Sequence, residues 1–432
     1  MNGEQSIDPL VSTRCAPGAA ADVLIIGGGV IGLACALELQ RAGRQVRILE
    51  RDRIGSGASH GNCGTLTPSH AEPLAAPGMI AKALRWMLKP DAPLYVAPRL
   101  DPTLWRWLWN FACRCNARDC RQATAPKSTL LETSRRMIEA FVREHALDCE
   151  FEAKGLLYAW IDPRQRDADL NDLKLLREVG VEAEVWDGAR IAAEEPSLRG
   201  RVIGGLLFPN DASLRPDRFV GELERLARAA GCEIVEHCAV TGFRRERGII
   251  VGVDTTQGPQ RGRDVLLAAG AWSPLLSRQL DLRLPIQPGK GYSITFDAQP
   301  AAPRRPLVLR ERSVCVTAWG SGFRLGSTME FSGYDDRLNR TRIDALVRGA
   351  GEYLREVPVG ARREEWFGWR PMTYDDLPIL GRAPGTDNLW LATGHGMMGV
   401  SMSLVTGRLL ADLMCGREPV LDPKPYACER VL

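Results

Sequence analysis

This chain of 432 residues has little net charge and few cysteines, and both scarcities exclude classes of function. Its 56 basic and 53 acidic residues leave a formal net charge of +3. They are dispersed, so we expect no nucleic-acid partner. Twelve cysteines are too few for a disulfide framework at this length, and we expect reduced thiols. Cys113, Cys115 and Cys120 cluster, but no second pair or histidine completes a ligand set, so we expect no metal.

The first residues lack a basic segment followed by an apolar run, which argues against a signal peptide. Residues 1–21 are largely polar and contain proline and glycine, so we expect a disordered extension. With reduced thiols, this predicts a cytoplasmic protein, with peripheral contact to the inner membrane or to a partner subunit as the alternative.

The clearest motif lies in Ala21–Glu50, where an apolar strand leads into G-x-G-x-x-G, a helix and a second strand. Gly27 permits the tight turn, Gly29 lets the backbone approach a pyrophosphate, and Gly32 lets helix and strand pack closely. The helix N-terminus favours that anion. The residues expected to form this site are Gly27, Gly28, Gly29, Val30, Ile31 and Gly32.

Glu50 ends the second strand, where its carboxylate can accept both hydroxyls of an adenosine ribose. It would repel a 2′-phosphate, which argues against NADP but leaves NAD and FAD open. A membrane helix is the alternative, since residues 21–37 carry a single charge. Four glycines beside a strand-like run argue against it.

Two later segments carry further chemistry. In Leu389–Met397, LWLATGHGM, a strand passes through a glycine turn into a helix. In a flavin enzyme such a turn faces the ring edge where negative charge develops on reduction. His395 in this turn is either structural or catalytic. Arg370 ends a strand before Pro371, where a guanidinium can bind a substrate carboxylate bidentately; a surface salt bridge is the alternative.

Together these segments resemble the FAD-dependent D-amino acid oxidase superfamily, and within it the bacterial D-amino acid dehydrogenases of the small-subunit type. The resemblance spans about residues 22–416. It rests on IIGGGVIG with Glu50, GASHGNCGTLTPSHAEPLAAPGM, LLAAGAWSP, PGKGYSIT, GWRPMTYDDLPILG and TGHGMMGVSMSLVTG.

The resemblance implies an α/β fold with an α+β insert. Residues 22–78, 212–284 and 372–432 would form a Rossmann-like FAD-binding domain assembled from discontinuous segments. Residues 79–211 and 285–371 would form a substrate-binding domain with a mixed or antiparallel sheet.

The resemblance also implies non-covalent FAD, because no suitable cysteine is present for a covalent link. Besides the glycine turn and Glu50, the residues expected at the cofactor are Arg51, Gly57, Ser59, Val240, Ala269, Gly270, Gly394, Gly396, Met397 and Gly399. Val240 falls where the family contacts adenine through its backbone.

The implied reaction is oxidative deamination of D-amino acids, with hydride passing from Cα to flavin N5. The imino acid is then hydrolysed to a 2-oxo acid and ammonia, and a quinone or other carrier takes the electrons. Arg370 would bind the carboxylate, and Tyr292 or Tyr334 would supply the family's aromatic hydroxyl. Arg370, Tyr292 and His395 are thus the candidate catalytic residues.

Three alternatives stay open from the sequence. The first is a D-proline or cis-4-hydroxy-D-proline dehydrogenase, the second a glycine- or sarcosine-type oxidase that uses oxygen. The third is a flavin-carrying electron-relay subunit. The tryptophan-rich stretch 104–111 predicts a helix, which is either buried between domains or docked on a membrane or partner.

Overall fold

The computed structural model describes residues 20–87, 91–357 and 362–431. The predicted disordered extension, residues 1–21, therefore lies outside the described residues except for its last two. Ala21 already belongs to the first strand.

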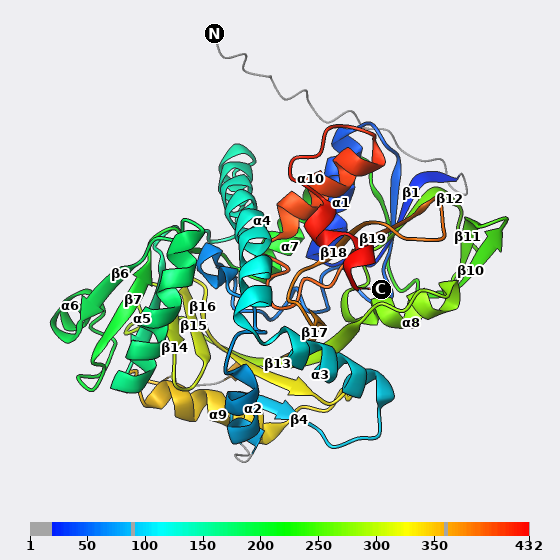
Figure 1. Cartoon of the computed structure of the whole chain (residues 1–432). Helices are drawn as coiled ribbons and strands as arrows, with labels where there is room; N and C mark the ends of the chain where they lie inside the picture. Colours follow the sequence, from blue (N-terminus) through cyan, green and yellow to red (C-terminus); the bar gives the residue numbers. More distant parts are fainter. Residues whose placement is uncertain (1–19, 88–90, 358–361, 432) are drawn as a thin grey trace, which may run out of the picture.

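One sheet in the described ranges has six strands in the order β18-β19-β12-β1-β2-β9 (Figure 1). All neighbours are parallel except β18, the antiparallel edge strand. Buried apolar runs such as VLII favour central parallel strands. The bounds are β1 Ala21–Ile26, β2 Val46–Leu49, β9 Glu233–Val235, β12 Gly262–Leu267, β18 Ile379–Arg382 and β19 Leu389–Thr393. Three distant segments of the chain thus build one sheet.

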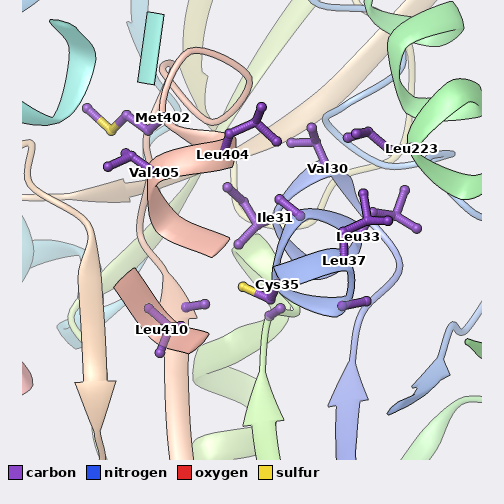
Figure 2. Packing of buried hydrophobic residues seen from close by; sticks show 14 of the residues in the cluster. Val30, Ile31, Leu33, Cys35, Leu37, Leu223, Met402, Leu404, Val405 and Leu410 are labelled. Carbon is purple, nitrogen blue, oxygen red and sulfur yellow. The ribbon is translucent and has the colours of Figure 1, made fainter. Parts of the chain in front are cut away.

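Helix α1 (Val30–Arg41) packs against α10 (Ser403–Met414) and α7 (Pro216–Ala229) beside this sheet. Figure 2 shows Ile31 and Cys35 of α1 on the side of α10, with Leu223 of α7 beyond Val30. Almost all of α1 is buried, which explains its nearly continuous apolar sequence.

The second large sheet has nine strands, mostly antiparallel, in the order β17-β13-β16-β15-β14-β5-β7-β6, with β4 paired to β16 (Figure 1). Helix α9 (Arg340–Gly351) packs on β13, β15 and β16. The strands are β4 Leu94–Val96, β5 Leu156–Trp160, β6 Glu184–Asp187, β7 Gly204–Phe208, β13 Ile286–Phe296, β14 Leu307–Leu309, β15 Val314–Trp319, β16 Gly322–Phe331 and β17 Arg362–Thr373.

Shorter elements complete the described chain. Two small sheets pair β3 (Thr65–Leu66) with β8 (Ala212–Ser213) and β10 (Val240–Glu246) with β11 (Ile249–Thr255). The other helices are α2 Met79–Met87, α3 Pro102–Arg114, α4 Ala117–Glu144, α5 Pro163–Glu178, α6 Gly188–Glu194 and α8 Ser273–Ser277. The 3-10 helices are η1 Pro68–Ala71, η2 Gly270–Trp272, η3 Arg278–Leu280, η4 Lys424–Tyr426 and η5 Cys428–Val431.

The long helix α4 departs from the domain division expected from the sequence. It lies within residues 79–211, which we assigned to the substrate-binding domain, yet it packs against α10 and η1. Its Leu130, Ile138 and Phe141 belong to the core around α1 and α10. An amphipathic pattern predicts that a helix has a buried face, but it does not indicate which sheet covers that face. The domain boundaries themselves stay a prediction.

Helix α3 contains the tryptophan-rich stretch, for which burial between domains and docking on a membrane or partner were the alternatives. Its features fit both. Trp107 is buried and its indole donates to the carbonyl oxygen of Met372 at 3.0 Å. Trp105 and Trp109 remain 57% and 71% exposed. One face therefore anchors the helix, while the other face is open to solvent.

The contact between α1 and α10 depends on Gly407, and this yields a stability prediction. A Cβ at Gly407 would lie 2.5 Å from the carbonyl oxygen of Ala34. We expect Gly407→Ala to lower the free energy of unfolding by about 1–3 kcal/mol, because the two helices must move apart. The matched control is Gly221→Ala in α7, where no atom lies within 4 Å. Better helix propensity should raise its stability by up to about 1 kcal/mol. Urea unfolding measures both, and equal effects would contradict the packing argument.

Candidate functional site

A cavity of about 2220 Å³ opens where the carboxyl ends of the parallel strands meet the nine-stranded sheet. Residues that follow β1, β2, β12 and β19 line one side of it, and residues of β16 and β17 line the other. In open α/β sheets, this edge is where ligands bind.

The glycine turn after β1 is shaped by close backbone contacts. Gly27 has a φ of 111°, and a Cβ there would lie 2.6 Å from the carbonyl oxygen of Ala268. A Cβ at Gly32 would lie 2.0 Å from the carbonyl oxygen of Gly27. A Cβ at Gly29 would meet only the Ser59 hydroxyl, at 3.3 Å. Gly27 and Gly32 therefore hold the turn together, while Gly29 leaves room for a ligand beside the N-terminus of α1.

Ser59 and Glu50 place polar groups around this turn. The Ser59 hydroxyl accepts the Val30 N–H at 3.1 Å, although it is remote in sequence. Glu50 accepts the N–H groups of Gly28 at 2.7 Å and Asp52 at 2.9 Å, one on each carboxylate oxygen. A carboxylate has about four acceptor positions, so both oxygens can still accept ligand hydroxyls. This arrangement fits the adenosine ribose of a dinucleotide.

Most of the residues expected at the cofactor border this cavity. They are Gly27, Gly29, Val30, Ile31, Glu50, Arg51, Gly57, Ser59, Val240, Ala269, Gly270, Gly396, Met397 and Gly399. Gly28, Gly32 and Gly394 do not border it. They support the turns: Gly28 donates to Glu50, Gly32 packs on Gly27, and Gly394 has a φ of 78°.

His395 lies in the second glycine turn, but its side chain serves that turn. The imidazole is buried and its Nε2 lies 3.1 Å from the Thr406 hydroxyl. Burial lowers the pKa of His395 to about 3, so the ring is neutral near pH 7. His395 also borders the cavity, where the neighbouring Gly396 N–H donates to the carbonyl oxygen of Pro371 at 3.0 Å. The catalytic role of His395 stays a prediction.

Arg370 is a cation on the wall of the cavity formed by β13 and β17. It pairs with Gly289 across β13–β17, and its guanidinium lies over Gly291, where a Cβ would come within 2.3 Å of Cζ. Nη1 donates to the carbonyl oxygen of Thr328 at 2.6 Å. In the described parts of the chain, no acidic side chain forms an ion pair with Arg370. Burial lowers its pKa, which a bound carboxylate would counteract.

The backbone at Thr328 is shaped to meet this guanidinium. Thr328 has a φ of 63°, a rare conformation for a β-branched residue. It lies where the register between β13 and β16 slips by a bulge. The bulge turns a carbonyl toward Arg370 and holds one end of the guanidinium, which leaves its other N–H groups for a ligand.

Tyr292 borders the cavity, but its hydroxyl already bonds within the protein, and its catalytic role stays a prediction. Side chains alternate along a strand, so Tyr292 shares a face with its partner Phe367, opposite the face of Arg370. Its hydroxyl donates to Glu330 at 3.1 Å in the core between β13, β16 and α9. The other candidate, Tyr334, donates to the carbonyl oxygen of Ala271 at 2.6 Å. Both hydroxyls therefore already donate hydrogen bonds within the protein.

Sequence reasoning missed several residues at the cavity. Trp272 lies under the Arg51 guanidinium, 4.4 Å from its carbon, and belongs to the LLAAGAWSP segment that the resemblance already marked. Thr328, Cys63 and Cys315 also line the cavity. No pattern in the neighbouring sequence identifies Thr328 or Cys315 as cavity residues, because only the pairing of strands brings them close to Arg370.

Metal-ligand clusters and membrane-spanning helices are both absent from the described residues. No group of three His, Cys, Asp or Glu residues in the described chain could hold a metal ion. Across the same ranges no helix is long and apolar enough to cross a membrane. The cysteines that the structure describes are free thiols.

The geometry at Glu50 predicts its importance for holding the dinucleotide. We expect Glu50→Ala to release much of the bound flavin, because ribose acceptors and two backbone partners are lost together. The matched control is Asp148→Ala, whose exposed carboxylate pairs with Arg218 and does not border the cavity. The ratio of flavin to protein absorbance after gel filtration is the measurement. Full flavin content in Glu50→Ala would contradict the assignment.

Comparison with known proteins identifies the family. Residues 22–413 match the family model DAO, described as FAD dependent oxidoreductase. The chain is similar to the D-amino acid dehydrogenase of Granulibacter bethesdensis, with 33% identity over 414 residues, 94% of this chain and 99% of the relative. The protein of the same name from Methylobacterium nodulans is 35% identical over 417 residues, 95% and 99% of the two chains.

Solved structures show the same fold. Glycine oxidase from Geobacillus kaustophilus superposes with a TM-score of 0.78 at 24% identity, covering 96% of this chain and 99% of that one. L-proline dehydrogenase from P. horikoshii gives 0.71 at 18% identity, covering 95% and 98%. The solved structures confirm the α/β fold, and the family match and the relatives confirm the resemblance inferred from the sequence and the choice of FAD over NAD. The chain therefore belongs to the DAO family of FAD-dependent oxidoreductases.

Proposed function

We propose that this enzyme oxidises D-amino acids and passes the electrons to a quinone or another carrier. The curated relatives that match nearly the whole chain carry the name D-amino acid dehydrogenase. The observation that carries the proposal is Arg370, whose guanidinium reaches the cavity without a carboxylate partner among the described residues. A substrate carboxylate can pair with the N–H groups that remain free.

The chain's own residues bind and orient the substrate. Arg370 binds the carboxylate with the N–H groups that Thr328 leaves free, and this limits how Cα can lie in the cavity. The cavity wall around Arg370 includes Trp366, Met372 and Met329, which exclude water from the reacting carbon. FAD, when bound, accepts the two electrons that leave the substrate. No paired carboxylate or charged histidine is required, because a neutral amine supports loss of hydride from Cα.

Substitution of Arg370 tests this role. We expect Arg370→Lys to lower kcat/KM for amino acids by about 10- to 100-fold, because a point charge replaces the planar fork and a charged hydrogen bond is worth about 1.5–3 kcal/mol. Arg370→Met should lose more. The matched control is Arg363→Lys, an exposed arginine on the same strand. Anaerobic stopped-flow reduction of the flavin measures each variant. Unchanged reduction in Arg370→Met would favour a flavin-carrying electron-relay subunit instead.

A substrate panel tests the rest of the proposal. Anaerobic bleaching of the flavin by D-amino acids, but not by their L-enantiomers, is the expected result. Preference for D-proline or cis-4-hydroxy-D-proline would select the narrower dehydrogenase. Steady oxygen consumption with glycine or sarcosine, without added acceptor, would contradict the dehydrogenase and favour an oxidase.

For the acceptor, we propose that a quinone approaches the apolar face formed by α2 and α3. No residue of α2 is buried, and Ile80 and Leu84 are exposed there, as are Trp105 and Trp109 on α3. Ile80, Leu84 and Trp105 border the cavity mouth, so this face leads toward the flavin side. Apolar exposed side chains beside cations such as Arg85 and Arg106 also suit contact with an anionic membrane surface.

We expect Trp109→Ser to weaken turnover with a long-chain quinone several-fold while leaving turnover with a small soluble dye unchanged. Trp109 is exposed and does not line the cavity, so flavin reduction by substrate should not change. Ile249→Ser, an equally apolar exposed site in the β10–β11 hairpin, serves as the control. If Trp109→Ser lowered turnover with the dye and with the quinone equally, the face formed by α2 and α3 would not be the quinone site.

A further inference from the structure

Two cysteines from distant parts of the chain meet inside the cavity. Cys63 lies in the loop between β2 and β3, and Cys315 lies on β15; both are half-buried and border the cavity. Gly326, the strand partner of Cys315, brings the two together, because a Cβ there would lie 2.5 Å from the Cys63 sulfur. Directly paired residues of neighbouring strands place their side chains on one face about 5 Å apart, so the Cys315 side chain lies beside that sulfur.

The loop that carries Cys63 is held against the sheet. The Thr317 hydroxyl donates to the carbonyl oxygen of Cys63 at 2.8 Å, and Arg324 donates to that of Asn62 at 2.7 Å. Thr317 lies two residues after Cys315 on the same strand, so both sulfurs are fixed on the same side of β15. Hydrogen bonds therefore hold the loop against the sheet at the place where the two thiols meet.

The charges around the pair favour one thiolate. The hydrogen bond from Cys315, with help from Arg324 and Arg370, lowers the pKa of Cys63 despite its burial. The pKa of Cys315 is raised, first by the same hydrogen bond and then by burial. Other buried cysteines behave differently; burial raises the pKa of Cys232 to about 12. Cys63 is thus the more nucleophilic sulfur and Cys315 its neutral neighbour.

We propose that Cys63 and Cys315 form a redox-active dithiol in the substrate cavity, which a peroxide converts to a disulfide. The Cys63 thiolate attacks one peroxide oxygen, the O–O bond breaks, and hydroxide leaves. The Cys315 sulfur then attacks the resulting sulfenic acid, an S–S bond forms, and water leaves with the Cys315 proton. Two thiols lose two electrons and two protons, and one hydrogen peroxide becomes two waters.

The disulfide would change the enzyme in two ways. It joins the loop that follows β2 of the nucleotide-side sheet to β15 of the other sheet, and a link that closes so long a loop restricts the unfolded chain. It also removes a thiolate that interacts with the Arg370 guanidinium. The first effect depends only on the dithiol. The second, a change in substrate affinity, rests on the proposed function of Arg370.

Thiol mapping of the holoenzyme tests the dithiol directly. After a few equivalents of hydrogen peroxide and alkylation, we expect a cross-linked peptide containing Cys63 and Cys315, about 2 Da lighter than the two thiol peptides together. Dithiothreitol should restore both thiols. Cys63→Ser and Cys315→Ser should each abolish the cross-link, and Cys113→Ser, an exposed cysteine on α3, should not. Alkylation of both thiols after peroxide, or terminal oxidation of Cys63 without a cross-link, would overturn the proposal.

Two further readouts separate this proposal from the proposed function. Oxidation should raise the thermal midpoint by several degrees and lower KM for the amino acid several-fold, because the anionic thiolate no longer competes with the substrate carboxylate for Arg370. Both effects should be reversed by dithiothreitol and absent in Cys63→Ser. A cross-link without any change in KM would refute the effect on Arg370 but keep the dithiol. No cross-link, together with inactive Arg370→Met, would refute the dithiol and keep the proposed function.

Discussion

The close approach of backbone atoms at the glycine turn is the constraint on which the rest of the site depends. Gly27, Gly32 and Ala268 bring β1, α1 and the end of β12 to within distances that no side chain tolerates. This contact aims the N-terminus of α1 at the cavity and keeps the space in front of Gly29 open. The Ser59 hydroxyl then satisfies the first helical N–H group, which otherwise lacks a partner.

A second constraint acts on the opposite wall, through the pairing of β13 with β17. Its register places Arg370 across from Gly289 and over Gly291, which lets a large cation lie flat against the sheet. The bulge in β16 supplies the Thr328 carbonyl at the same place. The substrate side of the cavity is thus defined by strand register, and the cofactor side by a local turn.

The cofactor side was largely predictable from the sequence. Gly27, Gly29, Gly32 and Glu50 lie within one strand-turn-helix-strand unit, so local geometry alone determines how they meet. The opposite wall was less open to prediction. Arg370 was identified from its motif, whereas the sequence did not indicate that Tyr292 lies on the opposite face of the same pair of strands and bonds to Glu330. Nor could it indicate that helix α4 packs on α10, which is remote in sequence.

By itself, the sequence predicted that a dinucleotide binds after the first strand, and its resemblance to a known family implied a flavin-dependent α/β enzyme. The first conclusion depends on one contiguous motif, in which spacing along the chain is equivalent to spacing in the molecule. The second depends on the resemblance of motifs spread along the chain. Only the tertiary structure decided which side chains face the substrate, because a shift of one residue along a strand moves a side chain to the other face. It alone also brought Cys63 to Cys315, since their contact depends on how a loop of one sheet rests on a strand of the other.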